Sequence, residues 1–493
     1  MSVATESRPN ILFILTDDQR HDTIGALGNP HIHTPNLDTL AENGFAFYKH
    51  FCTTPICTPA RAEVLTGCNS FTNGVPWFGM PIEPGLELLP QAFQNAGYHT
   101  IHVGKWHNDG HPRDKGYDQV RCVMDDSLLP RPIHGHTMRF GEPDGEFQGH
   151  STEVFTDAAI RALQEVPGDR PWFCYLGYHA PHDPHECPEP FASMYDPAKI
   201  PLYPNYMPEH PFDNGDMTIR DEQLENWPRT QEAMRRYRAR YYGIISHLDW
   251  NVGRLVGRLR TLGCLENTII VFTGDQGLAT GSHGLLGKEN MYDHSIASPL
   301  ILSGPGLPEG GRSNALSHHV DLFPTLCELA GIPCPESARD GFSLLPVLRG
   351  EQERVRDAVL CEFYSPEEPG QAMRHTQRAV RTERWKLTWF PHIGRFQLFD
   401  VQEDSCELID LLVPWRVRRR RAEAAGGKLW AKNKWAAHDL RVPYTQEEIE
   451  RVVKDLHKRM LDMMREQNDP IPESQLPPTP LPSQEGTCTP HGV

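Results

Sequence analysis

Two pairs of oxygen-bearing residues stand directly behind apolar segments of this chain. Asp17 and Asp18 follow one apolar run, and Asp275 and Gln276 follow another far along the sequence. Adjacent carboxylates are costly to bury without compensating charge, so a solvated turn or helix cap would explain the first pair alone. Oxygen ligands from separate segments are also what hard cations prefer. The two pairs together therefore predict a Ca²⁺ or Mg²⁺ site rather than a zinc site.

Cys57 opens a short segment, residues 57–65, that is predicted to be helical. Pro59 suits the first turn of a helix, where its missing N–H is not needed. The thiol would then lie at the positive end of the helix, beside backbone N–H groups that favour an anion. Arg61 can reach the same point with a bidentate cationic group. An isolated cysteine is usually a buried structural thiol, but the Cys-x-Pro-x-Arg spacing indicates a reactive centre.

Four strand-like apolar runs would position these residues and other polar clusters. Each is followed at once by polar side chains; the runs are residues 11–16, 98–103, 172–178 and 268–273. Continuous runs of this kind suit parallel strands buried on both faces. Helical patterns between them lie at residues 36–43, 152–165 and 235–262. We therefore expect an α/β sheet whose four polar clusters meet in one crevice, beyond the carboxyl ends of the strands.

The chain changes character after about residue 378. Residues 378–390 and 395–400 predict a small antiparallel sheet, and residues 445–465 predict an amphipathic helix. The Pro-, Ser- and Gln-rich stretch from Asp469 predicts a tail that is disordered or lies on the surface. The expected organisation is a catalytic domain at residues 1–377, a smaller subdomain at residues 378–468 and a tail at residues 469–493.

Composition narrows the class of protein. The 493 residues include 48 Lys and Arg against 65 Asp and Glu, a formal net charge of −17 that argues against nucleic acid as the main partner. No apolar run approaches the ~20 residues of a membrane-spanning helix, and the N-terminus lacks signal-peptide features. Twelve cysteines are too sparse for a disulfide scaffold, so most should be free thiols. We expect a soluble cytoplasmic protein with no membrane partner.

The motifs together resemble those of type I, formylglycine-dependent sulfatases of the alkaline-phosphatase superfamily. The similar segments follow the family order and are residues 10–19, 33–41, 57–67, 104–107, 180–184, 274–277, 287–288 and 320–326. The resemblance implies a large mixed, mostly parallel sheet flanked by helices, as in alkaline phosphatase. The smaller C-terminal antiparallel sheet and helix complete the expected fold, although the helix at residues 445–465 and the arginine-rich segment before it lie outside the recognisable match.

The resemblance assigns roles residue by residue. In the family the motif cysteine is oxidised to formylglycine, and Cys57 holds that position, so a formylglycine-generating maturation enzyme is an expected partner. The implied metal, Ca²⁺ in preference to Mg²⁺, would be held by Asp17, Asp18, Cys57, Asp275 and Gln276. The family often has Asn or His where Gln276 stands, which puts the coordination geometry in doubt. The implied catalytic residues are Cys57, Arg61, Lys105, His107, His182 and Lys288.

The substrate is less closely defined. Trp77 and Trp106 lie near the predicted crevice and could stack on sugar rings, whereas His179 and His283 are as easily structural as substrate-binding. The favoured reaction is hydrolysis of a sulfate monoester of a sugar, on a small molecule or an oligosaccharide. A phosphonate or phosphate ester hydrolase is the closest alternative, and an inactive scaffold or partner-binding protein is another. The arginine run at residues 416–421 favours a solvated surface over an anionic partner, and the oligomeric state stays open.

Overall fold

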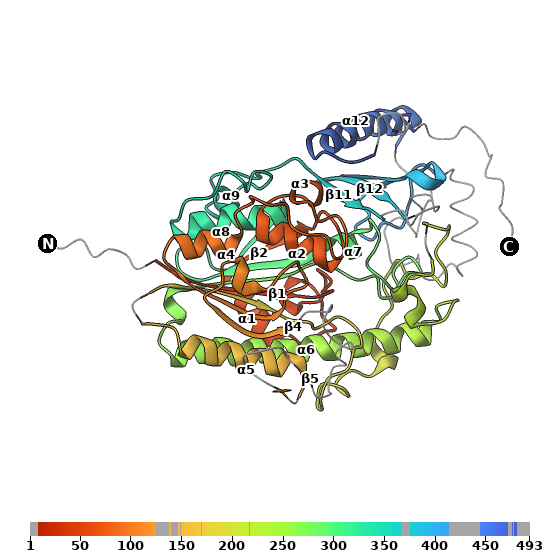
Figure 1. Ribbon diagram of the computed structural model, residues 1–493. Helices are drawn as coiled ribbons and strands as arrows, with labels where there is room; N and C mark the ends of the chain where they lie inside the picture. The colour runs from red at the N-terminus through yellow and green to blue at the C-terminus, as the bar shows by residue number, and fades with distance from the viewer. Residues whose placement is uncertain are drawn as a thin grey trace.

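A mixed eight-stranded sheet forms the centre of the molecule, seen in a computed structural model (Figure 1). The structure describes residues 8–124, 138–139, 146–147, 149–168, 170–215, 217–365, 375–413, 444–471, 476 and 478–480. The strand order is β10-β2-β9-β8-β1-β7-β3-β4. In chain order these strands are β1 (Asn10–Thr16), β2 (Gly44–Phe51), β3 (His99–Lys105), β4 (Gln119–Met124), β7 (Trp172–Gly177), β8 (Thr268–Gly274), β9 (Ala297–Ser303) and β10 (Gly311–His318).

Parallel pairing brings four strand ends to one edge of this sheet. β1 pairs in parallel with both β7 and β8, and Ile14 lies opposite Leu176 and Phe272. β3 continues the parallel set beyond β7, while β9 runs antiparallel to β2 and β8. The predicted large, mixed and mostly parallel sheet is confirmed. The segments that follow β1, β3, β7 and β8 therefore start from the same edge.

Both faces of the sheet are covered, which explains the continuous apolar sequence of its central strands. Alternate residues of β1 point to opposite sides: Phe13 joins one hydrophobic core and Ile14 the other. The first core includes residues of α2 (Cys57–Thr66), α4 (Leu89–Asn95) and α8 (Leu322–Ala330). The second includes residues of α1 (Pro35–Glu42), α5 (Ser151–Gln164) and α6 (Gln231–Thr261), and Figure 1 shows these two helix sets on opposite faces.

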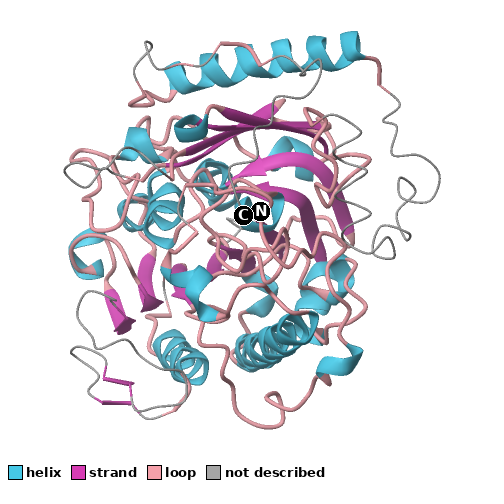
Figure 2. Ribbon diagram, turned by 90° about the vertical axis from the view of Figure 1, so that its right-hand side faces the viewer, coloured by secondary structure: helices cyan, strands magenta, loops and turns pink. Residues whose placement is uncertain are grey.

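A second, antiparallel sheet carries the C-terminal helix on its outer face (Figure 2). Its order is β11-β12-β13-β14, and the strands are β11 (Ala358–Phe363), β12 (Gln377–Thr382), β13 (Trp385–Phe390) and β14 (Arg395–Asp400). The helix α12 (Gln446–Glu466) buries one stripe against this sheet: Ile449, Val453, Leu456, Met460 and Met464. The predicted small sheet and amphipathic helix are confirmed, although the sheet starts earlier than expected, at β11.

The residues just past α12 are better ordered than the predicted tail. Asp469 forms a buried ion pair with Arg378 of β12, and Ile471 is buried in the core beneath α12. The prediction of disorder or loose surface contact was therefore wrong for residues 469–471, because a carboxylate buried against a guanidinium fixes the chain there. The boundaries after residues 377 and 468 stay predictions, and the arginine run at 416–421 lies outside the described residues.

Shorter elements connect these layers. They are the helices α3 (Ser70–Asn73), α7 (Asp293–Ile296) and α9 (Leu345–Leu348), the strands β5 (Met138–Arg139) and β6 (Glu146–Phe147), and the 3-10 turns η1 (Gly25–Leu27), η2 (Pro112–Lys115), η3 (Pro197–Lys199), η4 (Arg220–Leu224), η5 (Leu265–Asn267), η6 (His319–Asp321) and η7 (Pro391–Ile393). Within the described part of the chain, no helix has the length and apolar composition needed to cross a membrane. The eleven described cysteines are all free.

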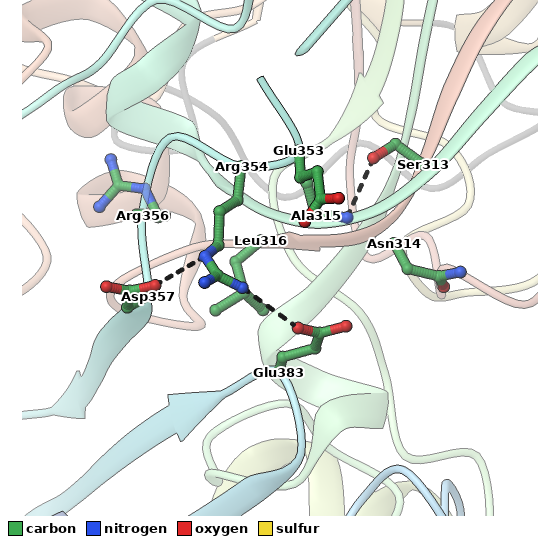
Figure 3. A pocket seen from close by; sticks show the side chains of 9 residues that line it. All are labelled: Ser313, Asn314, Ala315, Leu316, Glu353, Arg354, Arg356, Asp357 and Glu383. Carbon is green, nitrogen blue, oxygen red and sulfur yellow. Dashed lines mark hydrogen bonds and ion pairs between the residues drawn. The ribbon is translucent and has the colours of Figure 1, made fainter. Parts of the chain in front are cut away.

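A pocket lies where the edge strand β10 meets the second sheet (Figure 3). Its charged lining is paired: Arg354 contacts Asp357 at 2.8 Å and Glu383 at 3.8 Å. None of the residues that the sequence singles out for chemistry lines this pocket. The candidate site lies elsewhere, at the carboxyl ends of the parallel strands.

Candidate active site

The predicted residues come together because each follows or ends an element that reaches the same edge of the large sheet. Asp17 and Asp18 follow β1, and Asp275 and Gln276 follow β8. Lys105 is the last residue of β3, Cys57 is the first residue of α2, and the loops after β7 and β8 carry His182 and Lys288. The candidate site is therefore assembled from segments more than 200 residues apart in the sequence.

Three buried carboxylates form the centre of the site. One oxygen from each of Asp17, Asp18 and Asp275 lies within 4.8 Å of the others. Gln276 Nε2 donates to Asp18 Oδ1 at 2.6 Å and Cys57 Sγ at 3.2 Å, while its Oε1 is buried without a hydrogen-bond partner. A turn of the amide would present that orphaned oxygen to the carboxylates. Clustered carboxylate oxygens and a spare carbonyl are a donor set that fits a hard divalent cation.

Each carboxylate also faces one buried cation. Arg61 Nη2 lies 2.9 Å from Asp275 Oδ2, and Lys105 Nζ lies 2.5 Å from Asp17 Oδ2. Lys288 Nζ lies 2.7 Å from Asp18 Oδ2. The three acids and three bases balance, so a divalent ion would leave the centre positively charged. A centre of that charge attracts an anionic group.

The pKa values of the three carboxyl groups are shifted in different directions. Burial alone would raise the pKa of Asp17, but Lys105, His182 and Arg61 together hold that pKa well below its ordinary value. Burial raises the pKa of Asp18 to about 7 against the opposing effect of Lys288. Burial and the neighbouring Asp17 raise the pKa of Asp275 well above its ordinary value. Added positive charge at the centre would favour the ionised form of all three acids.

Cys57 lies against this cluster and is almost completely buried. Its side chain donates from Sγ to Asp17 Oδ1 at 3.1 Å, and the residue is 2% exposed. Burial, followed by the charge of Asp17, raises the pKa of the Cys57 thiol well above its ordinary value. Reactive cysteines usually have a lowered pKa. The setting is therefore unlike that of an ordinary cysteine nucleophile.

Two histidines from the loop after β7 flank the carboxylates. His182 Nε2 lies 3.7 Å from Asp18 Oδ2, and the ring of His179 lies 4.8 Å from that of His182. Burial, then the charge of Lys288, holds the pKa of His182 well below its ordinary value. Among the predicted histidines, the structure thus brings His182 into the cluster, with the ring of His179 against it.

His107 and Trp77 both contact Phe78. His107 has a positive φ of 58°, and its ring lies 5.6 Å from Phe78. The adjacent Asn108 donates to the carbonyl of Thr58, which follows Cys57, at 3.0 Å. The Trp77 ring packs edge-on against Phe78 at 5.4 Å. The Asn108 contact holds the segment that carries His107 close to the start of α2. The roles of His107 and Trp77 toward a substrate stay predictions.

Two residues predicted to bind substrate are engaged elsewhere. Trp106 is 1% exposed and packs in the hydrophobic core against His102 and Tyr117, so its indole presents no face to a sugar. This corrects the stacking role expected from its position in the sequence. His283 stacks on Tyr292 at 3.8 Å and its Nε2 lies 3.0 Å from the Glu407 carbonyl oxygen, contacts that tie two segments together rather than reaching the carboxylates.

Sequence reasoning missed four charged residues that border the site. They are Asp183, Arg220, Asp221 and Glu222. Asp183 stands beside His182 in a recognised motif, which was a usable signal. The other three lie in η4 within a long irregular stretch, where no spacing points to the site.

Comparison with known proteins agrees with this geometry. The family model described as Sulfatase matches residues 9–332, and the model described as N-sulphoglucosamine sulphohydrolase, C-terminal, matches residues 281–418. The chain belongs to the sulfatase family. The predicted resemblance and enzyme class are thereby confirmed. The family match covers every residue of the carboxylate cluster together with Cys57, Arg61, Lys105, His182 and Lys288.

Individual relatives give the range of chemistry in the family. An arylsulfatase of Clostridium perfringens is 27% identical over 82% of this chain and 90% of its own. An N-acetylglucosamine-6-O-sulfatase of Bacteroides thetaiotaomicron is 28% identical over 81% of this chain and 82% of its own. Among solved structures, the phosphonate monoester hydrolase of Agrobacterium radiobacter superposes with a TM-score of 0.70 at 26% identity, covering 86% of this chain and 96% of that one.

Proposed function

We propose that this sulfatase hydrolyses sulfate monoesters of sugars, using Cys57 oxidised to formylglycine and a bound Ca²⁺. The observation that carries the proposal is the convergence of Asp17, Asp18 and Asp275 within 4.8 Å, with Cys57 Sγ 3.1 Å from the first of them. This convergence supports the proposal because a nucleophile position, a cation site and an anion site would then share one buried centre. Sulfate ester hydrolysis needs these three elements together.

Asp17, Asp18, Asp275 and Gln276 would hold the ion, with residue 57 completing the set. When bound, the ion would polarise the sulfate group and favour the ionised nucleophile. As the hydrate of formylglycine, residue 57 would supply one hydroxyl for attack on sulfur and a second whose deprotonation would release sulfate. The remaining tasks fall to the side chains around it.

The cations bind and orient the anionic group. Lys105 and Lys288 would donate to sulfate oxygens whose charge shifts as the S–O bond to the ester breaks. Arg61, fixed by its pair with Asp275 at 2.9 Å, would hold the hydroxyl groups at residue 57 in position. The departing ester oxygen would gain a proton from Lys288 Nζ, or from His182 Nε2 when that imidazole is protonated on both nitrogens; both atoms lie beside Asp18. His107 would contact the sulfate from the other side.

The sugar sulfate class is supported by the similar N-acetylglucosamine-6-O-sulfatase and by the exposed aromatic side chain of Phe78, next to Trp77 and His107. A panel of defined sulfated mono- and oligosaccharides, assayed with and without exhaustive chelation, tests the proposal. We expect turnover that chelation abolishes and Ca²⁺ restores. Mass spectrometry of the peptide across residues 57–61 should show an aldehyde in place of the thiol. Full activity with unmodified Cys57 would refute the mechanism.

Phosphonate or phosphate ester hydrolysis is the second candidate. It is favoured by the likeness to the Agrobacterium phosphonate monoester hydrolase and by a centre whose positive charge would also attract a dianionic phosphate. The deciding quantity is kcat/KM for matched sulfate, phosphate and phosphonate esters of one leaving group. A tenfold preference for phosphonate, about 1.4 kcal/mol, would move the protein to this class.

The other expectations stay proposals with their own tests. An inactive scaffold is disfavoured by the complete set of Asp17, Asp18, Cys57, Asp275 and the three cations around them. A cytoplasmic location, supported by the free cysteines of the described chain, is tested by cell fractionation. Co-expression with and without a formylglycine-generating enzyme tests that partner, and sedimentation gives the oligomeric state.

A further inference from the structure

The 3-10 turn η4 carries three successive charged residues. Each of them contacts one of the two segments that carry His182 and Lys288. Arg220, Asp221 and Glu222 belong to the stretch between β7 and α6, outside the motifs recognised in the sequence. They have partners in the loop that carries His182 and in the loop that carries Lys288, and Glu222 also pairs with Arg229 at 2.7 Å. One short turn thus connects the two candidate proton donors.

Arg220 reaches the His182 side through Asp183. Its Nη2 forms a close ion pair with Asp183 Oδ2, and the other carboxylate oxygen of Asp183 lies 3.2 Å from His182 Nδ1. The carbonyl oxygen of Asp183 also lies 2.8 Å from the same nitrogen. With Nδ1 held in this way, Nε2 is the nitrogen that faces Asp18. Arg220 therefore fixes the carboxylate that sets the orientation of the imidazole.

Asp221 and Glu222 reach the Lys288 side. Asp221 Oδ2 lies 3.7 Å from Lys288 Nζ, and Asp221 Oδ1 accepts from Arg220 Nη1 at 2.7 Å. Glu222, which is 3% exposed, accepts from the backbone N–H of Leu286 at 3.0 Å and of Gly287 at 2.8 Å.

The contact of η4 with this loop is tight. A Cβ at Gly287 would lie 3.0 Å from the Asp221 Cβ, so the backbone of the loop packs directly on η4. Gly287, the residue before Lys288, therefore has little room to move toward the turn, and the hydrogen bonds to Glu222 hold it from moving away.

We propose that Arg220, Asp221 and Glu222 form a positioning turn that sets the spacing between His182 and Lys288, and with it the protonation of the leaving oxygen. This inference rests on the proposed function. Arg220 is assigned as a positioning residue rather than a ligand for substrate, because two carboxylates occupy Nη1 and Nη2. The turn acts on the reaction through the two residues it holds.

The leaving group gives this role a distinctive signature. A sugar alkoxide is a poor leaving group and needs a proton in the transition state, whereas 4-nitrophenolate leaves without one. Disturbing the spacing of the proton donors should slow the sugar ester much more than the aryl ester. A mere loss of folded enzyme would slow both by the same factor.

Arg220→Ala tests the proposal, because the Arg220 side chain is 38% exposed and the change removes no core packing. We expect kcat for glucosamine 6-sulfate to fall about tenfold to a hundredfold, a fraction of what a general acid contributes, and kcat for 4-nitrophenyl sulfate to change by less than about threefold. KM should stay near the wild-type value for both. Arg220→Lys should restore part of the loss, since one ammonium can meet only one of the two carboxylates well.

The matched control is Arg236→Ala, which removes a similarly exposed arginine paired with Glu232 at 2.6 Å on α6. It should leave both esters unchanged. Glu222→Ala, which removes the acceptor of both backbone N–H groups, should reproduce the selective loss on the sugar ester. Equal losses on both esters, no loss on either, or a rise in KM alone in Arg220→Ala would overturn the assignment.

Assays of the wild-type enzyme distinguish a failure of this inference from a failure of the proposed function. If the wild type hydrolyses phosphonate esters better than sulfate esters, the proposed function fails. The same comparison of alkyl and 4-nitrophenyl leaving groups is then made on phosphonates. The variant-to-wild-type ratio decides the role of the turn in either case.

Discussion

Two regions of this molecule bury networks of charge, and they serve different ends. At the active site, the carboxylates of Asp17, Asp18 and Asp275 crowd within 4.8 Å of one another. At the junction of the two sheets, Lys386 instead separates its acids, with Nζ 2.9 Å from Asp293 Oδ1 and in close contact with Glu407. Lys386 also donates to the Met291 carbonyl at 2.7 Å. We call this second group the junction cluster.

The difference shows that burial of charge alone does not mark an active site. In the junction cluster, Lys386 of β13 and the neighbouring Arg381 of β12 both pair with Asp293, the first residue of α7. Lys386 also donates to the carbonyl of Met291, so these contacts tie β12 and β13 to the segment around α7. At the active site each carboxylate also has a cation partner, but the three carboxylates crowd against one another and the Gln276 Oε1 atom has no hydrogen-bond partner. A stable fold tolerates such repulsion where an added cation relieves it. Mutation of the two clusters should therefore separate activity from stability.

Cys57→Ala should have the largest effect. We expect kcat to fall on the order of 10⁴-fold or more, because the nucleophile is lost, while the free energy of unfolding changes by about 1 kcal/mol. Steady-state kinetics and denaturant unfolding measure the two quantities. Cys68→Ala, at another buried free cysteine, is the control and should retain activity. Comparable activity in both variants would contradict the assignment of the nucleophile.

Lys386→Met should have the opposite profile. It leaves the buried Asp293 and Glu407 without their cation, and the free energy of unfolding should fall by about 3–5 kcal/mol. The activity per folded molecule should remain within a few-fold of the wild type. Lys199→Met, at a side chain that is 84% exposed, should change neither property. A loss of activity without a loss of stability would place the junction cluster in the chemistry.

Gln276→Leu tests the cation site without removing any member of an ion pair. The concentration of Ca²⁺ that gives half-maximal activity should rise about tenfold to a hundredfold, since one oxygen ligand is lost. The stability of the chelated protein should change little, because the orphaned Oε1 is removed together with the hydrogen bonds of Nε2. Calcium titration of activity, with thermal unfolding in chelator, gives both readouts. An unchanged calcium requirement would exclude Gln276 from the site.

Trp106→Phe should have the smallest effect and sharpens the boundary of the site. The buried indole packs against His102 and Tyr117, so we expect a loss of about 1–2 kcal/mol in the free energy of unfolding. KM for sugar sulfates should not change. Trp250→Phe, at an indole that is 45% exposed, is the control and should alter neither quantity. A raised KM in Trp106→Phe would restore the stacking role that the sequence indicated.

Much of the fold could be predicted from the sequence because its central strands are buried on both faces. Residues 11–16 and 268–273 form a continuous apolar signal, and they are neighbours in the sheet as β1 and β8. The strands β9 and β10 gave no such signal, because one contains Pro299 and the other is polar along most of its length. Pairing with distant strands, not local sequence preference, makes these segments extended.

The site was predictable to the extent that chemistry follows strand ends. Asp17 and Asp275 were found in this way, and Cys57 by its helix-start spacing. Trp106 was misjudged because the strand end at Lys105 does not say on which side the next residue points. Glu222 was missed because its function depends on backbone amides at Leu286 and Gly287, more than sixty residues away. Contacts of that kind leave no pattern in a single sequence.

The burial of Cys57 determines when the proposed oxidation can take place relative to folding. Cys57 is 2% exposed and lies in the first turn of α2, so its sulfur is closed to any second protein once the sheet and helix have packed. The proposed oxidation must therefore be finished while this segment is still unfolded, as the chain emerges or before its domain closes. Cells that make the folded protein without the maturation enzyme would accumulate molecules that later exposure to that enzyme cannot repair without unfolding. On the proposed mechanism, activity would be fixed at synthesis, and the specific activity of a preparation would record how many chains were modified in time.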